Sequence, residues 1–455
     1  MIDKLSEKNI WVKSSAQNDG NGSFDFPYSK IQTAVNEAAP GSTIVLFPGI
    51  YEEKLTVREL CGTIENPITI TAFNQDGEDV ISHSEWYFYS AKDFVVKGIT
   101  FRKTINSAIS VVGESHRNCI KDCIFDECGE LSECAVFFGG SGGENNIVEN
   151  CEFSAPKNCK NHIAVMISQN IDIEDDSVLN SKNASVRFCD FINCVTGIVA
   201  GSEDNVSGMF GGHEICENLF ENCENAVKIK ISGTQISNNI FRSNKIAIDN
   251  ACGFENEIFG NRFENCREAI AVCREDITIR ENMFFDSKIS IKNKSSENPV
   301  PILICENTFF STEDTAQVIA SEENIPIFIT KNIFYNCEIG ENKNFTIKDN
   351  LGKNIDFFDI TGGDFSTDTG YGCTGGAQKR TKIEEIPQID IVEMFREHEH
   401  KERFAGKMIE ERDLLMKSML FQDENAQEDE MEFEAAQVGQ QPLRPIGIDG
   451  ELEDN

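Results

Sequence analysis

The segment NRFENCREAIAV, from Asn261 to Val272, is one copy of the repeat that decides the fold of this 455-residue chain. In this copy Phe263 stands two residues after an asparagine and three before a cysteine. Nine phenylalanines share the position, each two residues after a cysteine or an asparagine: Phe125, Phe153, Phe191, Phe220, Phe241, Phe263, Phe284, Phe309 and Phe334. From Phe220 onward, successive copies are 21, 22, 21, 25 and 25 residues apart.

The spacing of this repeat predicts a solenoid. A fixed period of roughly 20 to 50 residues is typical of stacked units, none of which can bury its own apolar face alone. Within each copy, apolar residues alternate with polar ones over short runs broken by turns, and no helical period is present. We therefore expect an all-β solenoid in which each copy of the repeat forms one coil.

Two residue types in the repeat have structural explanations. The asparagines from Asn218 to Asn332 can stack, since each side-chain amide both donates and accepts, and asparagine also suits a left-handed corner. Five cysteines follow a repeat phenylalanine by three residues and are predicted to be core thiols, ~4.8 Å apart along the axis: Cys128, Cys194, Cys223, Cys266 and Cys337. That spacing is within disulfide reach in an oxidising compartment.

The charge of the chain excludes some classes of partner. The sequence holds 77 acidic and 41 basic residues, which gives a formal net charge of -36. Nucleic acids and anionic membranes both require a basic surface, so we expect neither as a partner. No apolar run approaches the length of a membrane span. No C-x-x-C motif is present to suggest structural zinc, and we expect no metal ligands.

The N-terminal sequence indicates a compartment. Residues 1–7, MIDKLSE, contain no apolar run of signal-peptide length. The chain has 17 cysteines, an odd number that does not suggest a disulfide scaffold. We expect a reduced, cytoplasmic protein, or a secreted one if a leader has been removed or export is non-classical.

A short helix is predicted near the N-terminus, over about residues 28–39. Ile31, Ala34, Val35 and Ala38 lie at helical spacing, and Ser29 is a candidate N-cap. Pro40-Gly41 ends the helix, and a buried strand is expected to follow over 43–47. Such a helix would cap the open end of the solenoid, whose first coil otherwise exposes apolar surface and free strand edges.

This opening resembles a known family. Several motifs are similar to the start of right-handed parallel β-helix proteins of the pectin-lyase-like superfamily, nearest to polysaccharide lyases of the alginate lyase and chondroitinase B type. The motifs are Phe26-Pro27, Ile31-Gln32-x-Ala34, the segments 40–46 and 48–53, and the segment 62–70. The resemblance implies a right-handed parallel β-helix up to about residue 378, where the segment 371–377 is similar to the closing segment of such helices.

The chain divides into two regions. Residues 1–378 are predicted to form the β-helix with its cap helix, and residues 379–455 an acidic tail with 10 basic and 21 acidic residues. Phe404, Met408, Leu415 and Met419 suggest an amphipathic helix within about 388–421. After about residue 422 the tail is expected to be disordered. The tail helix would either pack on the solenoid or bind a protein partner.

Counting from each phenylalanine aligns the strands that follow it. The seventh residue is apolar in five consecutive copies and is predicted to face the core, so the eighth and tenth should face outward. This places Lys228, Lys230, Asp249, Lys292 and Lys294 on one outer face. Such a lysine cluster can hold an anionic sugar, with Lys292, Lys294 and Arg274 as substrate-binding residues. The alternative is charge pairing between coils, for instance of Lys228 with Asp249.

The lyase resemblance implies a role for one of these lysines. In that family a lysine on such a strand is the base, with acidic calcium ligands just upstream and an arginine on the next coil. The segment VKIKIS, from Val227 to Ser232, is similar to the lysine strand and places Lys230 at the base position. The calcium-ligand and arginine positions are not matched: Cys223 and Asn225 stand upstream, and Asp249 and Ala251 on the next coil. We expect no cofactor, with calcium implied only by family analogy.

A second resemblance implies hydrolysis instead. Polygalacturonases, which are also β-helices, use an Asp-Asp pair, a Gly-His segment and an R-I-K strand in that order. Asp175-Asp176, Gly212-His213 and Lys228-Ile229-Lys230 follow the same order here, at different spacings and with lysine in place of arginine. Paired carboxylates can act as acid and base in glycoside hydrolysis.

These patterns leave two hypotheses of different class. The first is a carbohydrate-directed β-helix that binds, and can cleave, an acidic polysaccharide, with Lys228, Lys230, Asp249, His213, Asp175 and Asp176 as candidate catalytic residues. The second is a noncatalytic intracellular scaffold that binds a protein partner through its acidic solenoid and tail.

Overall fold

The structure, a computed structural model, describes residues 9–353 apart from short gaps at 18–19, 74–78, 132–133, 140–142, 158, 172–177, 202–209, 274–275, 293–299, 313–315, 322–324, 341 and 349. Four predicted site residues, Asp175, Asp176, Arg274 and Lys294, lie outside the described residues. So do the closing segment 371–377 and the tail 379–455, whose predicted helix and protein partner therefore stay predictions.

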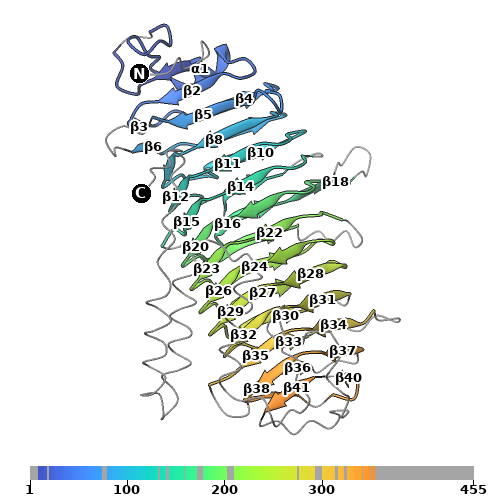
Figure 1. The fold of residues 1–455 in the computed structure, drawn as a ribbon. Coiled ribbons are helices and arrows are strands. Elements are labelled where there is room, and N and C mark those ends of the chain that lie inside the picture. Colours follow the sequence, from blue (N-terminus) through green and yellow to red (C-terminus); the bar gives the residue numbers. More distant parts are fainter. Residues whose placement is uncertain are drawn as a thin grey trace, which may run out of the picture. The chain divides into compact units, whose positions relative to one another are not determined.

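The described chain is an all-β parallel solenoid, as the repeat predicts. Successive strands pass through three parallel sheets, here named A, B and C, so that each strand pairs with the equivalent strand of the next coil (Figure 1). Within the described residues these sheets have 14, 13 and 12 strands respectively. A separate antiparallel pair, β17 (Gln169–Ile171) and β18 (Val178–Asn180), interrupts the coils after β16.

Sheet A consists of β1 (Asn9–Val12), β2 (Thr43–Leu46), β5 (Ile68–Ala72), β8 (Phe94–Lys97), β11 (Cys119–Lys121), β14 (Ile147–Glu149), β19 (Ser185–Arg187), β22 (Glu214–Cys216), β25 (Gln235–Ser237), β28 (Asn256–Phe259), β31 (Ile277–Arg280), β34 (Ile302–Cys305), β37 (Ile327–Thr330) and β40 (Phe345–Lys348). Sheet B consists of β3 (Gly49–Tyr51), β6 (Val80–Ser82), β9 (Thr100–Arg102), β12 (Ile124–Asp126), β15 (Glu152–Ser154), β20 (Asp190–Ile192), β23 (Leu219–Glu221), β26 (Ile240–Arg242), β29 (Arg262–Glu264), β32 (Met283–Phe285), β35 (Thr308–Phe310), β38 (Ile333–Tyr335) and β41 (Leu351–Lys353).

Sheet C consists of β4 (Leu55–Arg58), β7 (Trp86–Tyr89), β10 (Ile109–Val112), β13 (Cys134–Phe138), β16 (Ile163–Ile167), β21 (Thr196–Ala200), β24 (Asn225–Ile229), β27 (Ile246–Asn250), β30 (Glu268–Val272), β33 (Ile289–Ile291), β36 (Ala316–Ser321) and β39 (Cys337–Ile339). Lys228 lies on this sheet, and Lys230 and Lys292 directly follow its strands β24 and β33.

The nine repeat phenylalanines form one continuous stack on the inner face of sheet B. Phe101 extends the stack at its N-terminal end. Neighbouring rings are nearly parallel, with centroids 4.5 Å apart at Phe284–Phe309 and 5.2 Å apart at Phe101–Phe125. The rings therefore follow the coil spacing expected for paired strands, and they form the centre of the core.

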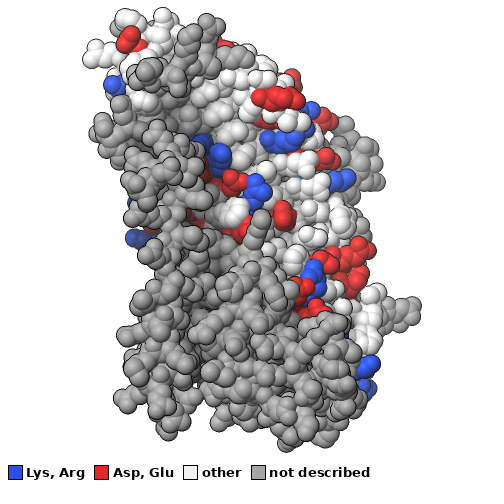
Figure 2. All heavy atoms as spheres, in the orientation of Figure 1, with Lys and Arg blue, Asp and Glu red and all other residues white. Residues whose placement is uncertain are grey.

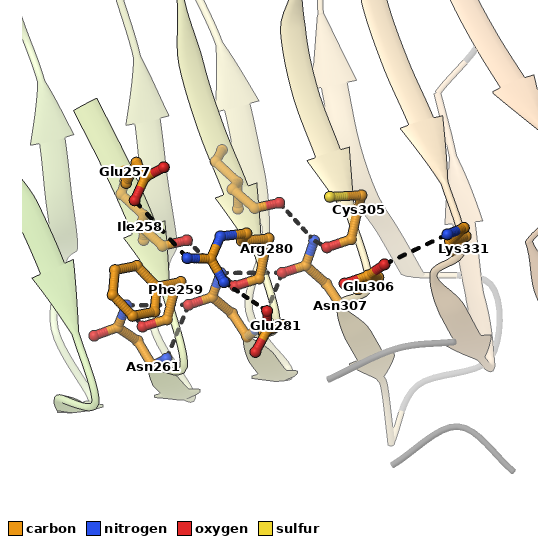
Figure 3. A network of polar contacts seen from close by, with 12 residues as sticks. Glu257, Ile258, Phe259, Asn261, Arg280, Glu281, Cys305, Glu306, Asn307 and Lys331 are labelled. Carbon is orange, nitrogen blue, oxygen red and sulfur yellow. Dashed lines mark hydrogen bonds and ion pairs between the residues drawn. The ribbon is translucent and has the colours of Figure 1, made fainter. Parts of the chain in front are cut away.

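The side-chain amides of the asparagines stack as predicted. The Asn261 Oδ1 atom accepts hydrogen bonds from the backbone N–H and from the Nδ2 of Asn239, both at 2.9 Å. The Asn261 Nδ2 donates to the Asn282 Oδ1 at 3.0 Å and to the Ile236 carbonyl at 2.8 Å. Figure 3 shows Asn261 and Asn307 of this ladder at the corner between sheets A and B. Each rung thus fixes the height of the next coil.

The left-handed corner does not fall on the ladder asparagines, and that prediction was wrong. It falls on the residue before each one, such as Glu217 at φ 58° and Glu281 at φ 57°. The ladder residue must hold its amide in the core, so the residue before it makes the turn. Asn238 and Gly260, which suit this conformation, occupy the position in two coils. In four coils it holds glutamate or lysine (Lys331, φ 56°), although neither favours it. The stack, not local preference, imposes the corner.

The core cysteines are confirmed. Cys128, Cys194, Cys223, Cys266 and Cys337 are all buried and are free thiols. In earlier coils cysteines also occupy the asparagine position of the ladder. The backbone N–H of Cys189 donates to the Asn218 Oδ1 at 2.9 Å, and the N–H of Cys151 donates to the Cys189 Sγ at 3.4 Å.

The cap helix is present but shorter than predicted. Helix α1 spans Ile31–Glu37, and its N-cap is Lys30, not Ser29. The N–H of Ile31 instead donates to the carboxylate of Glu53, which lies beyond the next strand in sequence. Tertiary contact has replaced the local cap. The described residues contain no helix with the length and apolar character of a membrane span.

Charged side chains on sheet A and at its corner with sheet B pair between coils. The Arg280 guanidinium lies 4.3 Å from the centroid of the Phe259 ring and 3.8 Å from the Glu257 carboxylate, and Lys331 lies 3.7 Å from Glu306 (Figure 3). Figure 2 likewise shows basic and acidic side chains interleaved on the face that it draws. These surface charges therefore form ion pairs between neighbouring coils.

We expect the side-chain amide hydrogen bonds of the ladder to stabilise the folded protein. We predict that Asn261→Ala lowers the free energy of unfolding in urea by at least about 3 kcal/mol, because it leaves buried donors and acceptors on two neighbouring coils without partners. Asn238→Gly is the matched control: it lies at the left-handed corner (φ 54°), where glycine is unstrained, and should change stability little. Equal losses in the two variants would contradict a special role for the stacked amides.

Candidate functional site

Two rows of side chains line the outer face of sheet C. The central row follows the strand register: Tyr87, Ser110, Phe137, Met166, Val199, Lys228, Asp249, Ala271 and Ser290. The edge row lies two residues further along each strand: Tyr89, Val112, Gly139, Ser168, Gly201, Lys230, Ala251, Cys273 and Lys292. Lys228, Lys230 and Lys292 therefore share one outer face.

The strand register of sheet C shows that one residue, Lys292, was predicted in the wrong row. Counting from the phenylalanines put Lys292 in the row of Lys228 and Asp249, but Ser290 pairs with Ala271 there. The N–H of Lys292 donates to the Val272 carbonyl at 2.8 Å, which puts Lys292 in the edge row. The cause is a coil whose turn between Phe284 and β33 is two residues shorter than the turns before it.

A charge cluster extends over four neighbouring strands: Lys228 on β24, Asp249 on β27 and Glu268 on β30, with Lys230 and Lys292 directly after β24 and β33. The Lys228 Nζ lies 3.9 Å from an Asp249 carboxylate oxygen, so the pairing alternative is confirmed for these two residues. The Lys292 Nζ contacts both Glu268 oxygens, at 2.8 and 2.9 Å. Three lysines against two carboxylates leave the cluster at +1 in a chain of net charge -36.

Asp249 is one of the two most enclosed charges of this cluster, beside Glu268, whose side chain is 16% exposed. The Asp249 side chain is 19% exposed, against 32% for Lys228. Burial raises the pKa of Asp249, while the charges of Lys228, Lys230 and Lys292 act to lower it. Because desolvation outweighs the lysines, the carboxyl can hold a proton at a higher pH than a solvated aspartate. This makes Asp249 suited to proton transfer.

Sequence reasoning missed Glu268. It stands five residues after Phe263, outside the eighth and tenth positions that the counting considered. Two thiols also lie beside the cluster: burial raises the pKa of Cys273, and the neighbouring Asp249 carboxylate and Cys252 raise it further. A count that included every outward position of each coil would have found Glu268.

His213 is not brought to this face. It lies in the core at the corner between sheets C and A, with 1% of its side chain exposed. Its Nδ1 accepts the backbone N–H of Ala184 at 3.2 Å, as the amides of Asn146 and Asn256 do for the N–H groups of Asn118 and Thr234. His213 is therefore a rung of a second corner ladder, and its predicted catalytic role receives no geometric support.

The donor set near Lys230 does not fit a calcium ion. The Cys223 thiol, which stands where the lyase resemblance expects an acidic ligand, is buried in the core with its Sγ 3.5 Å from the Phe191 carbonyl. The two carboxylates of the cluster are engaged by lysines. Calcium favours six or more oxygen ligands. Among the described residues, no group of three or more histidine, cysteine or acidic side chains could hold a metal ion.

A cavity of about 450 Å³ lies away from this cluster, at the corner between sheets A and B. Lys97 and Asp122, two of its lining residues, are 3.5 Å apart. None of the predicted site residues lines it.

Comparisons with known proteins agree on the fold. No protein-family model and no curated protein matches the chain, whereas 49 chains of solved structures do. The family 6 alginate lyase AlyGC is 16% identical with a TM-score of 0.57, over 84% of this chain and 58% of that one. XylC in complex with xylose is 12% identical with a TM-score of 0.54, over 78% and 87%.

A third match is the GH136 lacto-N-biosidase from Eubacterium ramulus, which is 14% identical with a TM-score of 0.53, over 76% of this chain and 67% of that one. At these identities the likeness shows the parallel β-helix fold alone, and the expected fold is thereby confirmed. One fold of this kind hosts many functions.

The buried imidazole of His213 should make the stability of the folded protein sensitive to acid. Burial lowers the pKa of His213 to about 4, whereas the unfolded chain takes up this proton near pH 6.5. Stability should therefore be full above pH 6.5 and fall by about 3 kcal/mol as the pH drops toward 4.

The variant that checks this is His213→Asn, whose amide oxygen can replace the Nδ1 acceptor. Urea unfolding at a series of pH values should show a flatter profile for the variant than for the native protein. An unchanged pH profile in the variant would show that His213 is not the group responsible.

Proposed function

We propose that the protein binds an acidic polysaccharide across the outer face of sheet C and cleaves it by β-elimination. The observation that carries this proposal is the charge cluster: three lysines and a partly buried carboxyl share one face of adjacent coils in a strongly acidic chain. A uronate polymer offers a carboxylate on each sugar, and lysines on one outer face can contact such carboxylates.

Each residue would have a defined part in the elimination. Lys228 neutralises the uronate carboxylate, which makes the proton on C5 easier to remove. The Lys230 amine takes that proton, and the electron pair of the C5–H bond becomes the C4–C5 double bond. The C4–O bond breaks, and the departing oxygen receives a proton from the Asp249 carboxyl. The reaction needs no oxidant or reductant.

The test is a screen of uronate polymers for unsaturated products, followed by ultraviolet absorbance. We expect product from at least one polymer, and a loss of about 100-fold or more in rate for Lys230→Ala, since a positioned base contributes at least that much. Lys121→Ala, which removes a lysine of β11 on sheet A, is the matched control and should keep full activity.

Two results would count against the proposal. If no tested polymer gave unsaturated product, the proposed lyase activity would be wrong. If Lys230→Ala were as active as Lys121→Ala, Lys230 would not be the base.

A further inference from the structure

Strand β7 carries four aromatic side chains, and two of them point out of the solenoid. Trp86 and Phe88 are buried in the core, whereas Tyr87 and Tyr89 are 36% and 37% exposed. The outward pair is therefore not needed to fill the core. Tyrosine presents a flat apolar face and a hydroxyl, which suits the C–H face and the hydroxyls of a sugar ring.

The positively charged side chain of Arg58 lies beside the outward tyrosines. Arg58 is the register partner of Tyr89 on the preceding coil, and its guanidinium lies 5.6 Å from the centroid of the Tyr89 ring. Arg58 is exposed. A planar guanidinium matches a carboxylate in a two-point hydrogen bond. The three residues thus combine stacking surface with a carboxylate-binding group.

The tyrosines occupy the same two rows as the lysine cluster. Tyr87 is in the central row with Lys228, and Tyr89 is in the edge row with Lys230. Five strand-to-strand steps separate β7 from β24 in sheet C. At ~4.8 Å for each step this is about 24 Å, the span of a short oligosaccharide of about five sugars.

Uncharged residues fill the two rows between these ends. The central row offers Ser110, Phe137, Met166 and Val199, and the edge row offers Val112, Gly139, Ser168 and Gly201. Both glycines keep side chains out of the strip. A Cβ at Gly139 would overlap the Phe137 ring, and one at Gly201, where φ is +99°, would lie 2.8 Å from the Lys230 carbonyl carbon.

We infer that Tyr87, Tyr89 and Arg58 form a distal subsite for the same polymer, about five sugars from the sugar held at Lys228 and Lys230. This inference rests on the proposed function, because it assigns the ligand as a uronate chain. Its consequence is selectivity for length: a long oligomer reaches both the lysine cluster and the tyrosines, and a trimer reaches only one of them.

The test compares the affinity of alginate and polygalacturonate trimers and octamers by calorimetry. Native protein should bind octamers more tightly than trimers. The double variant Tyr87→Ala/Tyr89→Ala should lose about ten-fold or more in octamer affinity, the combined effect of two stacking contacts, with trimer affinity at the lysine cluster unchanged. Tyr87→Phe/Tyr89→Phe keeps the rings and should retain most of the octamer affinity.

Phe328→Ala is the matched control, since Phe328 is an exposed aromatic of β37 on sheet A. Its octamer affinity should equal that of native protein, and urea midpoints should show that all variants fold. Octamer affinity unaffected by the double alanine variant, or no gain of octamers over trimers, overturns the distal subsite and leaves the proposed function standing. Failure of the native protein to bind any oligomer overturns the proposed function itself.

Discussion

The stacked amide ladder is the constraint on which the rest of the structure depends. Each ladder asparagine bonds to the coil before it and the coil after it, so neighbouring coils cannot slip without leaving buried amides unpaired. Slippage by one residue would also turn every strand's apolar side chains outward. Once the coils are fixed in height and register, the phenylalanine stack and the core thiols follow.

The same register creates the candidate site. Lys228, Asp249 and Glu268 are about twenty residues apart in sequence, yet they meet because they belong to successive strands of sheet C. No local motif holds them together. A solenoid converts a periodic sequence into rows of outward side chains, and a polymer with its own repeat can lie along such rows. Such rows of outward side chains, rather than an enclosed cavity, form the candidate site.

Period and alternation were sufficient to predict the core. The phenylalanines and the buried cysteines were found because one residue of each kind recurs at a near-constant interval, and the structure places them as counted. Lys228 and Lys230 also face outward as counted. Lys292 was misplaced because one coil is two residues shorter, a variation that counting from a single landmark cannot detect. Glu53, not Ser29, accepts the N–H at the start of the cap helix, and Glu281 has a left-handed backbone conformation. At both places tertiary contacts override the local preference of the residue. His213 shows the same limit: its pairing with Ala184 depends on a fold corner that the sequence does not mark.

A crystal structure of the Lys230→Ala variant with an oligouronate is the most direct measurement of the central claim. The account predicts sugar lying across the strands of sheet C, with one carboxylate in hydrogen-bond distance of Lys228 and the chain extending toward β7. Sugar bound on sheet A or B, or in the cavity beside Lys97, would contradict it.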